Sequence, residues 1–244
     1  ETAVSRCHLA VEDIVVSPYA SALGCLSDDE KKMGVTCIDM GGGTTSVVVF
    51  FDGELVHSQV LPLGGEHVTN DISRGLVTPL IHAERMKTLY GNALPSVSDD
   101  QQVIQVPPMA AEPMDEGSAV PRSMLVGIIR PRIEEIFEKL RDRLAESGFD
   151  KVAGRGLVLT GGASQLGGVA ELASRLLDKQ VRLGRPLAMS GMPEAAVGPT
   201  FATCRGLLNY GFGDSAEEAD MDDRAGVKPS GSMGRIGQWL RENF

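Results

Sequence analysis

The sequence lacks the clustered cysteines that a disulfide framework or a zinc site requires. Its four cysteines are scattered and form no CxxC pair, and its four histidines show no ligand spacing. We therefore expect no directly bound metal, and we expect the cysteines to be small buried apolar residues in a reducing compartment. These residues are Cys7, Cys25, Cys37 and Cys204.

Long apolar runs and excess basic charge are also missing. Without a stretch of about 18 apolar residues, the sequence predicts no membrane-spanning segment. The formal net charge is −10 at pH 7, which argues against a nucleic-acid partner because such a partner favours a basic surface. No secretory signal opens the chain and no initiating methionine is present. We expect that an N-terminal part of a larger protein is missing.

What the chain does contain is an alternation of strand and helix patterns, which indicates an α/β fold. Its 244 residues, 42% of them hydrophobic, allow one large domain or two small ones. The expected strands lie at 13–17, in a hairpin over 35–51, and at 54–61, 103–106, 156–160 and 180–184. The expected helices lie at 21–26, 66–76, 79–90, 122–147, 164–177 and 199–209. Pro131 is expected to kink the longest of these helices.

The most informative motif is DMGGGTT, which begins at Asp39 and lies between two β-branched runs. A strand that meets an aspartate, turns on glycines and threonines, and returns as a strand is typical of a phosphate-binding hairpin. Glycine permits the tight turn and lets bare N–H groups approach phosphate oxygens. Asp39 stands where a carboxylate holds Mg²⁺ through water. The candidate phosphate-binding residues are Asp39, Gly41, Gly42, Gly43, Thr44 and Thr45. The alternative is a plain glycine-rich turn, and the motif is not a Walker loop.

Two further sequence patterns are typical of a nucleoside-binding site. TGGAS follows an apolar strand and opens the helix expected at 164–177, so Gly161, Gly162 and Ser164 present backbone amides at a helix start. Alternatively, this is an ordinary βα turn capped by Ser164. Glu84 and Lys87 share one face of the helix expected at 79–90 and can bind ribose hydroxyls and an adenine edge. The alternative is a solvated ion pair.

The C-terminal part of the chain changes character. Residues 213–231 are acidic and almost free of aromatic residues, which predicts a disordered linker. Residues 232–244 place their large apolar side chains on one face of a helix, with polar side chains outside it. Such a helix lies in the plane of a membrane surface, unless it docks on its own globular domain. The residues expected to insert are Met233, Ile236, Trp239, Leu240 and Phe244.

Taken in order, DMGGGTT, AERMK and TGGAS resemble the second phosphate loop, the nucleoside-contacting helix and the adenosine loop of the actin/Hsp70 ATPase superfamily. Within that superfamily the chain is most similar to the FtsA family of bacterial division proteins. The resemblance covers essentially the whole chain. The segments that carry it are SPYASALGCLSDDEKKMGV, LPLGGEHVTNDISRGL, VLTGGASQLGGVAELA and PTFATCRGLLNYG.

The resemblance implies an actin-like (ribonuclease H-like) ATPase fold. Residues 1–34 then end the first lobe, residues 35–212 form the second lobe, and 213–231 and 232–244 are the linker and the membrane-targeting helix. The first phosphate loop and the inserted subdomain of the family are absent from this sequence. ATP and Mg²⁺ are the implied cofactors, with Glu84, Lys87, Gly161, Gly162 and Ser164 at the nucleoside.

The same resemblance implies an adaptor that anchors FtsZ filaments to the cytoplasmic face of the inner membrane at the division septum. Its second lobe would dock the FtsZ C-terminal tail, and it would self-associate into actin-like filaments and meet other division proteins. It implies weak ATPase activity at most and no catalytic residue in this chain. The alternatives are a sugar kinase, an Hsp70-type chaperone or a pilus-assembly actin homologue. A chaperone would continue into a β-rich domain, and a pilus protein would lack the amphipathic helix.

Overall fold

The computed structural model describes residues 1–109, 117–149, 151–188 and 191–221, with the backbone alone over 212–221. Residues Glu1–Asn209 form one compact unit, and the chain from Tyr210 onward forms another. The helices are α1 (Thr2–Ser5), α2 (Ser17–Cys25), α3 (Asp28–Met33), α4 (Gly65–Leu76), α5 (Leu80–Tyr90), α6 (Arg122–Ser147), α7 (Val169–Leu177) and α8 (Ala202–Met221). Short 3₁₀ turns are η1 (Asp99–Gln101), η2 (Gly162–Gln165), η3 (Glu194–Ala196) and η4 (Pro199–Phe201).

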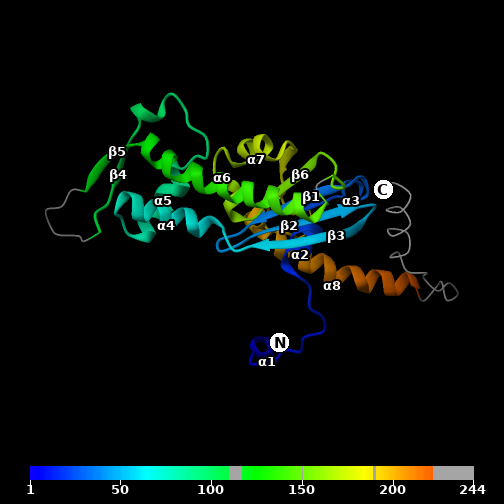
Figure 1. Cartoon of the computed structure of the whole chain (residues 1–244). Helices are drawn as coiled ribbons and strands as arrows, with labels where there is room; N and C mark the ends of the chain where they lie inside the picture. The colour runs from blue at the N-terminus through cyan, green and yellow to red at the C-terminus, as the bar shows by residue number, and fades with distance from the viewer. Residues whose placement is uncertain (110–116, 150, 189–190, 222–244) are drawn as a thin grey trace. The chain divides into compact units, whose positions relative to one another are not determined.

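A five-stranded mixed sheet forms the centre of the first unit. Its strand order is β3 (Glu54–Leu61), β2 (Thr45–Phe51), β1 (Val35–Met40), β6 (Gly156–Thr160) and β7 (Gln180–Leu183). The pairs β1–β2 and β2–β3 are antiparallel, whereas β1–β6 and β6–β7 are parallel. A second, two-stranded sheet pairs β4 (Val103–Val106) with β5 (Ser118–Pro121). This mixed architecture confirms the α/β fold (Figure 1).

Helices cover both faces of the large sheet, and the alternation of side chains along each strand explains why. Ile38 and Met40 of β1 point into a core made with α4, α5, α6 and α7. Val35 and Cys37, which alternate with Thr36 and Ile38 along the strand, belong to a smaller core with α2 and the start of α8. Because helices cover both faces, β1 and β2 are buried along almost their whole length, and most of their residues are apolar. Helix α6 contributes one apolar stripe at helical spacing, made of Ile129, Ile133, Ile136, Phe137, Leu140 and Leu144.

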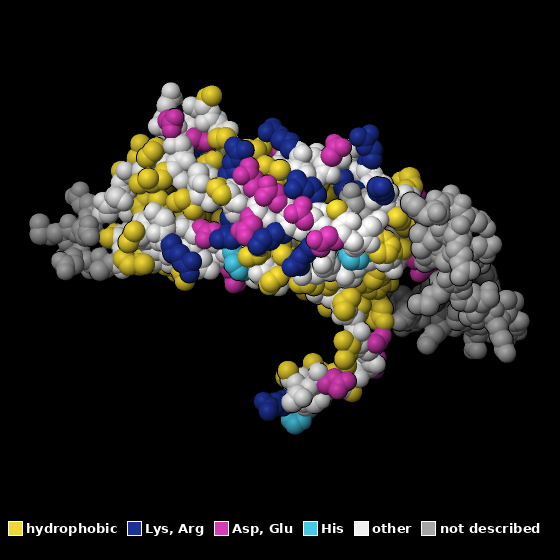
Figure 2. All heavy atoms as spheres, viewed as in Figure 1, with side chains coloured by type: hydrophobic (Ala, Val, Ile, Leu, Met, Phe, Trp, Pro, Cys, Tyr) yellow, Lys and Arg dark blue, Asp and Glu magenta, His cyan; other side chains and the backbone are white. Residues whose placement is uncertain are grey.

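The opposite side of α6 is charged. Arg130 pairs with Glu134 at 2.7 Å, and Lys139 pairs with Glu135 at 2.8 Å. Acidic and basic side chains are intermixed over this region of the surface in Figure 2. Among the described residues, none of the helices combines the length and the apolar character needed to cross a membrane.

Helices α2 and α8 touch through their backbones. A Cβ atom on Gly24 would lie 2.1 Å from the carbonyl oxygen of Ala202, and one on Gly206 would lie 1.6 Å from that of Ala20. Only glycine therefore fits at either position, since the atoms that a methyl group would meet are main-chain atoms.

Most of the expected elements are present within one or two residues, including the hairpin, α4, α5, β4, α6 and β6. The strand expected at 13–17 is wrong: helix α2 begins at Ser17, where Pro18 suits the first turn. The helix expected at 164–177 is present as α7 and ends at Leu177 as expected, but its start is wrong, because η2 ends at Gln165 and α7 begins only after Gly168, which has φ +76°. Strand β5 and helix α3 were not expected, although Ser27 and Glu30 form a capping box at α3.

The C-terminal expectations are only partly covered by the structure. The helix expected to end at 209 starts at Ala202 and continues to Met221, so it includes the first residues of the predicted linker. Helix α6 is continuous through Pro131. The rest of the linker and the predicted membrane helix, with Met233, Ile236, Trp239, Leu240 and Phe244, lie outside the described residues.

Candidate functional site

A pocket of about 850 Å³ lies at the carboxyl ends of the parallel neighbours β1 and β6. Ligands of open α/β sheets commonly bind at this edge. Its lining combines glycines, polar side chains and an apolar wall. The lining includes Gly41, Gly42, Gly65, Glu66, Val68, Thr69, Leu80, Ile81, Glu84, Lys87, Ile133, Gly162, Gln165, Leu166 and Thr200.

The glycine hairpin presents unused N–H donors at this pocket. The N–H of Gly41 closes the turn on the carbonyl of Thr44 at 2.8 Å. The carbonyls of Gly41 and Gly42 accept hydrogen bonds from helix α4, each at 2.9 Å. Within the described residues, the N–H groups of Gly42, Gly43 and Thr44 have no partner. The hairpin therefore offers three backbone donors suited to an anion.

The structure divides the predicted phosphate-binding residues into two groups. Gly41 and Gly42 line the pocket, whereas Gly43, Thr44 and Thr45 do not. The hydroxyl of Thr45 is buried and donates to the carbonyl of Leu63 at 2.8 Å, so it fixes the hairpin.

Asp39 does not line the pocket either. Its Oδ2 accepts hydrogen bonds from the hydroxyl of Ser21 on α2 at 2.5 Å and from that of Thr203 on α8 at 3.4 Å. The two hydroxyls also lie 2.7 Å apart. Asp39 thus joins the end of β1 to two helices that are far from it in the sequence.

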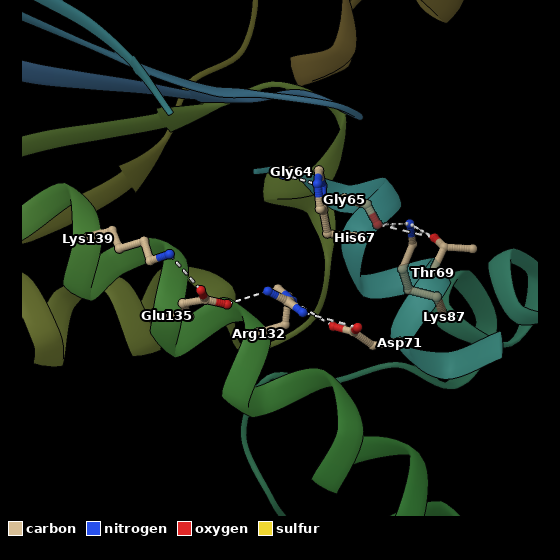
Figure 3. Close-up of polar contacts among 9 residues, drawn as sticks. All are labelled: Gly64, Gly65, His67, Thr69, Asp71, Lys87, Arg132, Glu135 and Lys139. Carbon is tan, nitrogen blue, oxygen red and sulfur yellow. Dashed lines mark hydrogen bonds and ion pairs between the residues drawn. The ribbon is translucent and has the colours of Figure 1, made fainter. Parts of the chain in front are cut away.

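Glu84 and Lys87 both line the pocket but have different surroundings. Lys87 Nζ lies 3.0 Å from the carbonyl oxygen of Gly65, 2.8 Å from Oγ1 of Thr69 and 2.7 Å from Oε2 of Glu84. These contacts use all three ammonium donors, and they draw the first turn of α4 against α5 (Figure 3). Thr69 also donates to Oε2 of Glu84 at 2.5 Å. Oε1 of Glu84 accepts no hydrogen bond from the described residues, so Glu84 is the member of the pair that can accept one from a ligand.

The pKa of the Glu84 carboxyl lies below its usual value. Burial by itself would raise this pKa, but hydrogen bonds from Lys87 and Thr69, together with the charge of Lys87, outweigh the burial and lower it. Glu84 is therefore ionised at neutral pH.

Because folding lowers the pKa of Glu84, replacing this residue should change the stability of the fold in a pH-dependent way. A carboxyl whose pKa is lowered by folding stabilises the fold above its unfolded pKa, and this contribution disappears as pH falls through the folded-state pKa. We expect Glu84→Gln to reduce the free energy of unfolding at pH 7 by less than about 1 kcal/mol, since solvent screens this half-exposed side chain. At acidic pH, below the folded-state pKa of Glu84, the difference should vanish. Urea denaturation across this pH range measures it. In a Lys87→Met background the pH dependence of the stability difference should largely disappear. An unchanged pH dependence would contradict the assignment of the lowered Glu84 pKa to Lys87.

The second glycine loop contributes one predicted residue to the pocket, Gly162. Gly161 has φ +85°, and a Cβ there would lie 2.3 Å from Oδ1 of Asp39. The hydroxyl of Ser164 is buried and donates to the carbonyl of Gly161 at 2.7 Å. Ser164 therefore closes the turn, and it does not cap a long helix as expected.

Six polar lining residues were not predicted from the sequence, namely Glu66, Thr69, Asn70, Thr88, Gln165 and Thr200. Glu66 and Thr69 lie on the face of α4 that carries Gly65, so helical spacing from the GG pair was a usable signal. Gln165 and Thr200 approach from separate turns, and Nε2 of Gln165 donates to Oγ1 of Thr200 at 3.0 Å. No local pattern in the sequence predicts this second pair.

Comparison with known proteins identifies the family. The family model "Cell division protein FtsA" matches residues 36–206. The chain belongs to the FtsA family. The cell division protein FtsA of Rhizobium meliloti is 46% identical over 100% of this chain and 56% of its own length. That of Escherichia coli K12 is 34% identical over 99% of the chain and 59% of its own length. The chain thus spans a little over half the length of these relatives.

A solved structure supports the fold. MreB5 of Spiroplasma citri, in a crystal structure bound to ADP, superposes with a TM-score of 0.71 at 15% sequence identity. The superposition covers 92% of this chain and 66% of MreB5. The actin-like ATPase fold implied by the sequence motifs is confirmed.

Proposed function

We propose that the full-length protein binds ATP in the pocket described above. The observation that carries this proposal is that Gly42, whose backbone N–H is free, and Glu84, whose Oε1 is free, line one pocket. The volume of about 850 Å³ lies within the usual range for small-molecule sites. The hairpin donors would bind the phosphates and Glu84 would accept a hydrogen bond from a ribose hydroxyl. Gly162 would lie beside the base. MreB5, which shares the fold, is bound to ADP in its crystal structure, and this supports nucleotide binding by the present chain.

Magnesium fits this site only through water. Oδ2 of Asp39 already accepts two hydrogen bonds, and Asp39 does not line the pocket, so direct ligation is disfavoured. We propose that Asp39 orients a water molecule of a hydrated Mg²⁺ ion. The ion would neutralise phosphate charge when bound. We assign no catalytic residue, and we expect weak ATP hydrolysis at most.

We further propose that the protein is a membrane adaptor for FtsZ filaments at the division septum. Membership of the FtsA family supports a role in cell division. Helix α5 also exposes Leu89 and Tyr90, which do not line the ATP pocket, by 56% and 45%. They give an apolar surface suited to the FtsZ C-terminal tail. Self-association into actin-like filaments would place many copies of the segment 232–244 along one membrane surface. The combined attachment would then be much stronger than that of one copy.

The test of the adaptor proposal is membrane attachment through Trp239. Trp239→Glu places a charge on the apolar face of the predicted interfacial helix. We expect Trp239→Glu to lower the amount of protein recovered with anionic liposomes about tenfold in a flotation assay. The reason is that insertion of the apolar side chains supplies most of the membrane affinity. Gln238→Glu adds the same charge outside that face and is the matched control. Equal recovery of Trp239→Glu and the wild-type protein would show that this segment is not the anchor.

A further inference from the structure

The first turn of α4 is seated directly against the glycine hairpin. The N–H groups of Gly65 and Glu66 donate to the carbonyls of Gly41 and Gly42, each at 2.9 Å. A Cβ on Gly64 would lie 2.4 Å from the Gly42 oxygen. The hairpin therefore holds its shape only while the backbone over 64–66 keeps its position.

His67 holds this backbone from the other side. Its imidazole Nδ1 accepts a hydrogen bond from the backbone N–H of Gly64 at 3.1 Å (Figure 3). The backbone N–H of His67 donates to the carbonyl of Gly64, also at 3.1 Å. The first N–H groups of a helix have no partner within the helix, and the N-cap residue Gly64 has no side chain to supply one. His67 does not line the pocket, so it would not contact a ligand there.

We propose that His67 is a positioning residue that sets the affinity of the pocket for the phosphate groups of a nucleotide. This inference rests on the proposed nucleotide binding. An imidazole accepts at Nδ1 only when it is neutral with its proton on Nε2. An apolar side chain at this position leaves the N–H of Gly64 without a partner. The turn then loosens and the hairpin donors lose their fixed direction. The nucleoside half of the site, at Glu84, does not depend on this turn in the same way.

Two substitutions at one position test the proposal in the full-length protein. His67→Leu removes the acceptor, whereas His67→Gln restores one at the third helical position, as in a capping box. We expect His67→Leu to lower the affinities for ATP and ADP about tenfold, which corresponds to the free energy typical of one helix cap. The affinity for adenosine should not change. His67→Gln should remain within about twofold of the wild-type affinities. Titration with fluorescent nucleotides, with adenosine as a competitor, measures all three ligands.

Hydrogen exchange without nucleotide provides the independent measurement. His67→Leu should speed amide exchange at Gly64, at Gly41 of the hairpin, and at Gly65 and Glu66, whose N–H groups donate to the hairpin carbonyls, and His67→Gln should not. An equal loss of adenosine and ATP affinity, or a failure of His67→Gln to restore it, would overturn the positioning role. If the wild-type protein binds no nucleotide, the proposed function fails. In that case unchanged exchange at the hairpin in His67→Leu would separately overturn the role of His67.

Discussion

Gly206→Ala is expected to lower the free energy of unfolding by about 4 kcal/mol or more, which is a large part of the stability of a typical domain. The added methyl group would lie 1.6 Å from the carbonyl oxygen of Ala20 and 2.4 Å from its carbonyl carbon. Backbone atoms cannot rotate away as a flexible side chain would, so α2 and α8 must separate. That separation also disrupts the contacts of Ser21 and Thr203 with Asp39 at the end of β1.

The matched control is Gly127→Ala, which makes the same change in α6. No atom lies within 4 Å of a Cβ built on Gly127, and alanine is the better helix former by up to about 1 kcal/mol. We expect this variant to be slightly more stable than the wild-type chain. Urea denaturation followed by circular dichroism measures both variants. A Gly206→Ala chain as stable as Gly127→Ala would mean that α2 and α8 do not pack as described.

Gly42→Val is expected to abolish ATP binding, lowering affinity by about a hundredfold or more, while the chain still folds. The new side chain would enter pocket space next to the free N–H donors of the hairpin, and loss of this order matches that of several charge-assisted hydrogen bonds. The fold should tolerate the change because the closest atom to a Cβ on Gly42 is Oε1 of Glu66, at 2.9 Å, at the end of an exposed side chain.

Gly43→Val serves as the comparison for Gly42→Val. A Cβ on Gly43 meets no atom within 4 Å, and Gly43 does not line the pocket. Its substitution retains the N–H and should change ATP affinity far less. Fluorescent-nucleotide titration of the full-length protein distinguishes the two, with thermal unfolding as the check on folding. Equal affinities in Gly42→Val and the wild-type protein would exclude this hairpin as the phosphate site.

The fold was predictable wherever the signal is local. The hairpin of β1 and β2 is marked by two β-branched runs on either side of a glycine turn, and α6 is marked by an apolar stripe at helical spacing. The structure contains both. The broken helix after TGGAS was missed because Gly168 takes a left-handed conformation, and it lies so close to a distant segment that a Cβ there would be 2.4 Å from Oδ1 of Asn92. Similarly, Ile14, Val15 and Val16 form a β-branched run typical of a strand, yet they pair with no strand among the described residues.

The site was predictable as a set of segments but not as a set of roles. Sequence order placed Gly42, Glu84 and Gly162 in one family pattern, and all three line one pocket. The distinct roles of Glu84 and Lys87 depend on Gly65, because the carbonyl of Gly65 accepts one of the hydrogen bonds that the Lys87 ammonium donates. Gly65 lies 22 residues before Lys87 in the chain. The partners of Asp39 lie 18 and 164 residues away from it in the chain. Such distant contacts leave no trace in a local pattern.

The hydrogen bonds between α4 and the hairpin also have an electronic consequence. The carbonyl of Gly41 and the N–H of Gly42 belong to one peptide group, and the carbonyl of Gly42 and the N–H of Gly43 belong to the next. When α4 donates to these carbonyls, each peptide group is polarised and its free N–H becomes a stronger donor, by on the order of 10–30% per bond. The positive end of the α4 dipole is thus relayed through two peptide groups to the edge of the pocket. An anion at the hairpin would experience the field of a helix whose first N–H groups it does not touch.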